Sequence, residues 1–100
     1  MDVIQILEVG IDKKGRLFIR PVVTSLKNKE SFEFVYRAAM AIYWDKKEEY
    51  FHASTAEDED MPYRKWFEQI VDAVKSELGF SLELSKATIW TGISNQFNKV

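Results

Sequence analysis

The pattern of apolar positions predicts a β-hairpin in the first part of the chain. Residues 3–11 are rich in β-branched side chains and are apolar on both alternating faces, which predicts a strand covered on both sides. Residues 12–15 begin with Asp and end with Gly, which is a turn signal, and residues 16–20 alternate again. Because Pro21 has no amide hydrogen, we expect the second strand to lie at an edge of the sheet or to end near this residue.

A helical spacing of apolar residues follows between Ser31 and Tyr43. These residues recur at intervals of three and four, and the stretch includes several alanines, so we predict a helix there. Its first turn also alternates as a strand would, and the point where the helix ends stays open. Between residues 43 and 53, aromatic residues flank a Lys-Lys-Glu-Glu turn region, which predicts a second hairpin.

The clearest helical pattern lies between Pro62 and Leu78. One wide face of this stretch is apolar and the opposite face is charged, which is typical of a helix that packs on a core. Both of its ends are marked in the sequence. Asp60 can cap the N-terminus, Pro62 suits the first turn, and Gly79 fits the left-handed position after the C-terminus.

The last part of the chain predicts one more extended region. Residues 80–84 alternate between apolar and polar as a half-exposed strand does, and residues 88–91 continue extended. A short C-terminal helix can follow, with Ile93, Phe97 and Val100 on one side. The order ββαββαβ predicts a single α+β domain over residues 1–100, with a mainly antiparallel sheet and two main helices packed on one face.

The composition, 46% hydrophobic and 30% charged residues, is that of an ordinary globular protein. The chain has no cysteine, which excludes disulfides and thiolate zinc sites, and its single histidine, His52, excludes a multi-histidine metal site. We expect no cofactor, because a chain of 100 residues leaves little room for an enclosed cavity. The longest apolar run, residues 38–44, is too short for a membrane span, and the N-terminus shows no secretory signal, so we expect a cytoplasmic location.

The net charge of −2 is unevenly distributed, because residues 45–60 contain seven acidic residues against two lysines. The acidic segment of this region consists of Glu57, Asp58, Glu59 and Asp60. Clustered carboxylates can bind Ca²⁺ or Mg²⁺, complement a helix dipole, or attract a basic partner. The ligand spacing of a calcium loop is absent, so we expect no metal site, and the other two interpretations stay open.

A smaller basic patch consists of Lys13, Lys14, Arg16 and Arg20. Apart from Phe18 it lacks the interleaved aromatic residues that accompany many nucleic-acid surfaces. We therefore interpret it as a solvated turn and expect no nucleic-acid binding.

Fourteen aromatic residues are a high number for this length, and such residues dominate both cores and interfaces. Trp66 lies on the apolar face of the predicted helix, whereas Trp44 and Trp90 lie near strand ends and can stay half exposed. His52 could act as a general base, but no nucleophile motif accompanies it, so we assign no catalytic residue and favour a packing or surface role. The candidate binding residues are Tyr43, Trp44, Tyr50, His52 and Trp90.

Five short signatures carry a resemblance to a known group of proteins. They are Tyr-Arg-Ala-Ala at 36–39, Tyr-Trp-Asp at 43–45, Trp-Phe-Glu-Gln-Ile at 66–70, Glu-Leu-Gly at 77–79 and Thr-Ile-Trp at 88–90. Together they resemble small proteins carried on bacterial integron gene cassettes, over roughly residues 3–93. The resemblance implies a bacterial, cytoplasmic, single-domain α+β protein with no assigned activity, and no catalytic residue can be carried over from it.

These features favour a non-enzymatic binding module that acts through protein–protein contacts. The alternative is a small-molecule-binding protein or minor enzyme, with an aromatic pocket near Trp44 and Trp90 and with His52 or an acidic residue as its polar group. Small domains with edge strands and exposed aromatic residues often pair, so we also expect a homodimer. We expect no contact with a membrane.

Overall fold

A computed structural model of the chain describes residues 2–22, 29–39 and 41–93. The elements of these residues are β1 (Asp2–Ile11), β2 (Arg16–Pro21), the 3₁₀ helix η1 (Lys29–Arg37), β3 (Ile42–Asp45), β4 (Tyr50–Ala56), α1 (Tyr63–Ala73), the π-helical turn η2 (Val74–Leu78), β5 (Phe80–Glu83) and β6 (Ile89–Thr91). The predicted C-terminal helix needs Phe97 and Val100, which lie outside the described residues.

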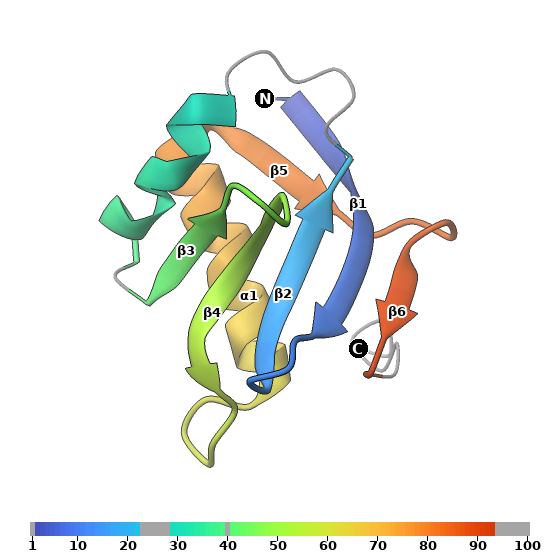
Figure 1. The fold of residues 1–100 in the computed structure, drawn as a ribbon. Helices are drawn as coiled ribbons and strands as arrows, with labels where there is room; N and C mark the ends of the chain where they lie inside the picture. Colours follow the sequence, from blue (N-terminus) through green and yellow to red (C-terminus); the bar gives the residue numbers. More distant parts are fainter. Residues whose placement is uncertain (1, 23–28, 40, 94–100) are drawn as a thin grey trace.

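The six strands of the described residues form one mixed sheet in the order β3-β4-β2-β1-β5, with β6 also paired to β1 (Figure 1). The pairings β1–β2, β2–β4 and β3–β4 are antiparallel, whereas β5 and β6 both run parallel to β1. The predicted α+β class is confirmed. The sheet, however, is not purely antiparallel, and the order ββαββαβ is wrong because two strands, not one, follow the last helix.

The predicted C-terminal extended region is split by a turn at residues 85–88. The Thr88 hydroxyl donates to the Ile6 carbonyl at 2.8 Å and accepts from the Ser85 amide at 3.0 Å. Thr88 is buried, so these bonds fix the turn against β1. As a result β5 pairs with the first half of β1, and β6 pairs with its second half.

The predicted first hairpin is confirmed. The Asp12 carboxylate accepts hydrogen bonds from the amides of Lys14 and Arg16. Gly15 has a φ of 80°, in the left-handed region that favours glycine. Pro21 is the last residue of β2, which confirms the expectation that the strand ends there. The edge position was wrong, because β2 lies between β1 and β4.

The helix predicted between Ser31 and Tyr43 is shorter than expected. η1 ends at Arg37, and Ile42 and Tyr43 belong to β3. Ile42 pairs with Ala53 of β4, so a strand ladder supplies the hydrogen bonds that a longer helix would have made. The second hairpin, predicted from the aromatic residues on both arms, is confirmed as β3 and β4.

The long helix is confirmed as α1 continued by η2, and Gly79 follows it in the left-handed conformation with a φ of 80°. Its N-terminus differs from the prediction. Pro62 occupies the N-cap position, and Asp60 does not cap the helix; instead the Glu57 carboxylate accepts from the Tyr63 amide at 2.9 Å. The Tyr63 hydroxyl donates to the Gly15 carbonyl at 3.0 Å, which ties the start of α1 to the first hairpin.

The core lies between α1 and one face of the sheet. Trp66 and Ile70 from α1 pack in one buried cluster with Phe51 of β4 and Ile19 of β2. Phe32 of η1 joins this cluster, with its ring 5.5 Å from that of Phe51. In Figure 1, α1 lies behind the sheet, and the opposite face points toward the viewer. None of the helices in the described ranges is long and apolar enough to cross a membrane.

Candidate functional site

The sheet face opposite α1 carries three of the five candidate binding residues. Register pairs His52 of β4 with Tyr43 of β3 and with Phe18 of β2. Successive strand residues point to opposite faces, so Phe51 faces the core while its neighbours Tyr50 and His52 face away from it. We call this surface the open face, because no helix of the described residues covers it (Figure 1). It is defined by Phe18, Arg20, Tyr43, Tyr50 and His52.

Phe18 and Tyr50 form a stacked aromatic pair at the centre of the open face. Their ring centroids are 4.4 Å apart and their planes differ by 19°. The Arg20 guanidinium lies 5.2 Å from the Tyr50 ring centroid and 5.7 Å from that of Phe18, within the range of cation–π contacts. Burial, reinforced by nearby carboxylates, raises the pKa of the Tyr50 hydroxyl. The protonated hydroxyl can donate and accept hydrogen bonds.

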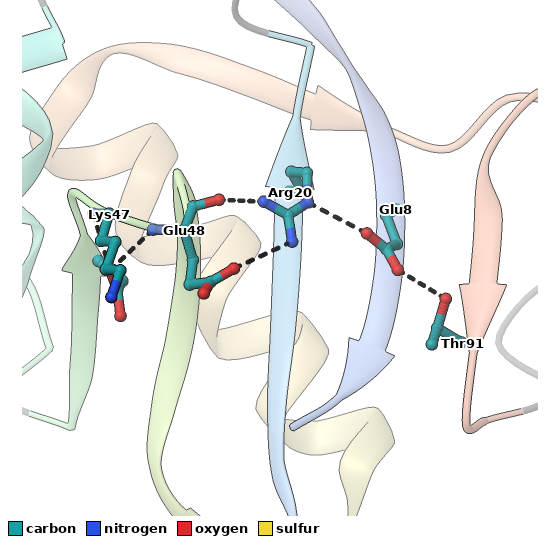
Figure 2. A network of polar contacts seen from close by, with 6 residues as sticks. Glu8, Arg20, Lys47, Glu48 and Thr91 are labelled. Carbon is teal, nitrogen blue, oxygen red and sulfur yellow. Dashed lines mark hydrogen bonds and ion pairs between the residues drawn. The ribbon is translucent and has the colours of Figure 1, made fainter. Parts of the chain in front are cut away.

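Arg20 also centres a polar network that crosses the open face (Figure 2). Its Nε donates to the Glu8 carboxylate of β1 at 3.1 Å, and Glu8 accepts from the Thr91 hydroxyl of β6 at 2.6 Å. Toward β4, Arg20 donates to the Glu48 backbone carbonyl and lies 3.8 Å from the Glu48 carboxylate. The network joins β6, β1, β2 and the β3–β4 turn, and it pairs each charge with a partner.

His52 is held as a packing residue of the open face. It is 9% exposed, and its ring lies 5.9 Å from that of Tyr43 and 6.0 Å from that of Tyr50. Its Nδ1 lies 2.8 Å from the Ala53 backbone carbonyl, an acceptor, so Nδ1 carries the proton. A backbone carbonyl thus orients the ring where a catalytic base would have a carboxylate. This geometry supports the packing interpretation of His52.

The two candidate tryptophans lie apart from the rest of the candidate set. Trp44 pairs with Phe51 and packs against the Phe32 and Phe51 rings at 5.0 and 4.7 Å, so it points to the core side of β3. Trp90 lies on β6 and pairs with Val9 of β1, far from β3 in the strand order of the sheet. Trp44 borders a hollow of about 230 Å³, which neither Trp90 nor His52 lines. The structure therefore brings together Tyr43, Tyr50 and His52, but not the two tryptophans.

The acidic segment is exposed, and its carboxylates divide into two pairs. Glu57 accepts from the Tyr63 amide, and Asp58 accepts from the amides of Asp60 and Met61 at 2.9 and 2.8 Å. Among the described residues, the Glu59 and Asp60 carboxylates accept no such bond. In that same part of the chain, no group of three or more His, Asp or Glu side chains is arranged to hold a metal ion.

This division predicts different effects for the two pairs. Replacing Glu57 and Asp58 together by alanine should lower the free energy of unfolding by about 1–2 kcal/mol, because the turn and the helix start lose their acceptors. The matched double substitution Glu59→Ala/Asp60→Ala should change it by less than about 0.5 kcal/mol. Urea unfolding of both variants is the measurement. Equal losses in the two variants would contradict the division.

The β1–β2 turn, which the sequence pattern indicated only as a solvated turn, borders a hollow. Lys13, Lys14, Arg16 and Arg20 all line a hollow of about 450 Å³ on the open face, beside the Phe18 and Tyr50 rings. A signal was available, since Arg16, Phe18 and Arg20 occupy alternating positions of one predicted strand and therefore share a face.

Asp12 makes the turn sensitive to acid. Burial acts to raise the pKa of Asp12, but the hydrogen bonds from Arg16 and Lys14 and the 2.7 Å ion pair with Arg16 outweigh it and lower the pKa below 3.8. A lowered folded-state pKa stabilises the fold above the unfolded value and loses that effect as the pH falls through the folded value. We expect the Asp12→Asn variant to be less stable than the wild type at pH 7, and the difference to shrink below about pH 4. Urea unfolding between pH 2.5 and 7 measures this; a difference that is constant over that range would count against it.

Comparison with known proteins gives one family. Integron cassette protein Hfx_Cass5 matches residues 2–88, which contain β1 to β5 and the turn before β6. No curated protein and no solved structure matches the chain. The match confirms the resemblance that the aromatic signatures indicated, and it covers most of the 100 residues. The chain therefore belongs to the integron cassette protein Hfx_Cass5 family.

Proposed function

We propose that this protein is a non-enzymatic binding module whose open face engages a protein partner. The observation that carries the proposal is the exposure of large apolar side chains at both edges of this face. Tyr43 on β3 is 43% exposed, and Ile89 on β6, which pairs with Glu8 of that face, is 54% exposed. Exposed large apolar side chains mark candidate interaction surfaces, and tyrosine is one of the residues enriched in protein–protein interfaces.

The centre of the open face is suited to burial under a partner. Arg20 already has carboxylate and carbonyl partners, so covering it would not leave a desolvated charge without compensation. Arginine and tyrosine are also the residues that most often contribute large shares of binding energy in interfaces. The packed position of His52, with its Nδ1 bound to a backbone carbonyl, favours binding over proton-transfer chemistry.

Three further expectations belong to this proposal. The protein acts in the bacterial cytoplasm, a second copy of the chain is one partner that the open face could take, and the partner is neither a nucleic acid nor a membrane. In this proposal the Glu59 and Asp60 carboxylates attract a partner with a basic surface and so increase its association rate. Such steering affects mainly the association rate and weakens with salt.

A matched pair of tyrosine variants tests the proposal. Tyr43 and Tyr36 are equally exposed, at 43%, but Tyr36 lies on η1, away from the open face. Tyr43→Ala should weaken capture of a protein partner from a bacterial lysate, or self-association measured by sedimentation, at least tenfold, about 1.4 kcal/mol. Tyr36→Ala should leave both unchanged. Equal effects of the two variants, or the absence of both a captured protein partner and self-association, would overturn the proposal.

A further inference from the structure

The hollow at the β1–β2 end of the open face has a positive charge in a chain whose net charge is negative. Four cationic side chains line it, Lys13, Lys14, Arg16 and Arg20, against the carboxylates of Asp12 and Glu48. The local net charge is therefore +2, and that of the chain is −2. Its volume is about 450 Å³ and it is wide open to solvent, so a ligand there would be held at the surface by charge rather than enclosed.

Three of the four cations have donors that remain available to a ligand. Arg20 is committed to Glu8 and Glu48. Arg16 donates from its Nε to Asp12, which holds the guanidinium in place and leaves its terminal nitrogens available to a ligand. Lys13 and Lys14 are exposed, and neither forms an ion pair with another described residue.

A tyrosine hydroxyl that is in contact with solvent is the second observation at this hollow. Tyr50 lines the hollow and is only 7% exposed, and its ring is fixed by stacking on Phe18. Its hydroxyl makes no hydrogen bond to another described residue. The Tyr50 hydroxyl is not one of the buried unpartnered polar atoms of the described residues, so it can exchange its contact with water for a hydrogen bond to an acceptor that a ligand supplies.

We propose that this hollow binds a small organic dianion, in which a phosphate or a pair of carboxylates accepts from the Tyr50 hydroxyl and is neutralised by Arg16, Lys13 and Lys14. A charge of −2 matches the local charge of +2. Because the hollow is larger than one such group, the rest of the ligand lies against the apolar wall formed by Ile11 and Phe18. The site does not depend on the protein partner proposed above.

Titration of the ¹⁵N-labelled protein at constant ionic strength tests the site. Inorganic phosphate, phenyl phosphate and succinate serve as probes, with sodium chloride as the control. We expect saturable amide shifts at Lys13, Lys14, Arg16 and Tyr50, and tighter binding of phenyl phosphate than of inorganic phosphate, because its ring adds an apolar contact. A stronger response to phosphates or to succinate identifies which dianion the hollow prefers.

Matched variants separate this site from general attraction to positive charge. Tyr50→Phe keeps the stacked ring and removes only the hydroxyl, and it should weaken binding about tenfold. Lys13→Gln/Lys14→Gln should do the same, whereas the controls Tyr43→Phe and Lys46→Gln/Lys47→Gln should have no effect. Shifts no larger than those in sodium chloride, or binding that Tyr50→Phe leaves unchanged, would overturn the proposal.

Discussion

Replacing Phe51 by alanine is expected to lower the free energy of unfolding by about 4 kcal/mol. Phe51 is fully buried, and its ring contacts the Phe32 ring at 5.5 Å and the Trp44 ring at 4.7 Å. The substitution would remove these contacts at once and leave a cavity between β4 and η1. In a small domain such a loss is a large share of the total stability.

The measurement is urea unfolding followed by tryptophan fluorescence, with Tyr43→Ala as the control. Tyr43 lies on the neighbouring strand but points to the open face, so its loss should cost less than about 1 kcal/mol. A loss below about 2 kcal/mol for Phe51→Ala would show that this ring is not at the centre of the core.

The second large effect concerns Gly10, where β1 has no room for a side chain. A Cβ atom there would lie 2.5 Å from Cζ of Phe18 and 2.9 Å from the backbone carbonyl oxygen of Thr91. The Phe18 ring thus lies over the bare backbone of β1, next to the strand contact with β6. Gly10→Ala is expected to cost about 2–3 kcal/mol, because both neighbours must shift.

Phe18→Leu provides the test of that cause, because leucine lacks the ring atoms nearest to Gly10. Adding Gly10→Ala to a Phe18→Leu background should cost at least about 0.5 kcal/mol less than adding it to the wild type. The part that remains belongs to the Thr91 carbonyl, which no side-chain substitution removes. Strictly additive costs in the double-mutant cycle would show that the ring is not the obstacle.

The elements that the sequence predicts best are those with local signals. The turn at residues 12–15 is decided by Asp12 and Gly15, which act within four residues. The helix that starts at Tyr63 has a long apolar face and a glycine after its end. Its N-cap was misassigned because the Glu57 side chain reaches forward over six residues to the Tyr63 amide, farther than the usual capping pattern.

The helix predicted as far as Tyr43 shows where local periodicity fails. Phe32 and Val35 are buried at a spacing of three, which a 3₁₀ helix and an α-helix share. Ile42 continues that spacing by coincidence, since its burial results from pairing with Ala53 on β4. Likewise, nothing local to residues 80–91 indicates that they run parallel to β1, because that pairing spans most of the chain.

The candidate binding residues were grouped by type, and strand geometry explains why the group divides. Tyr43 and Trp44 are consecutive on β3, so a strand directs them to opposite faces. Tyr50 and His52 are two apart on β4 and therefore share a face. The role of Arg20 could not be predicted, since its contacts with Glu8 and Glu48 depend on the register of three strands.

The pairing of β1 with both β5 and β6 affects how the chain folds as it leaves the ribosome. Strand β1 needs residues 80–91, which are synthesised after it, to complete its outer edge, so that edge stays unpaired until those residues have been made. Until then this edge of β1, which includes Val3 and Leu7, presents a row of free amide and carbonyl groups. Such an edge can pair with other chains. Nascent chains stalled before residue 80 should therefore be the species most prone to aggregate and to bind chaperones.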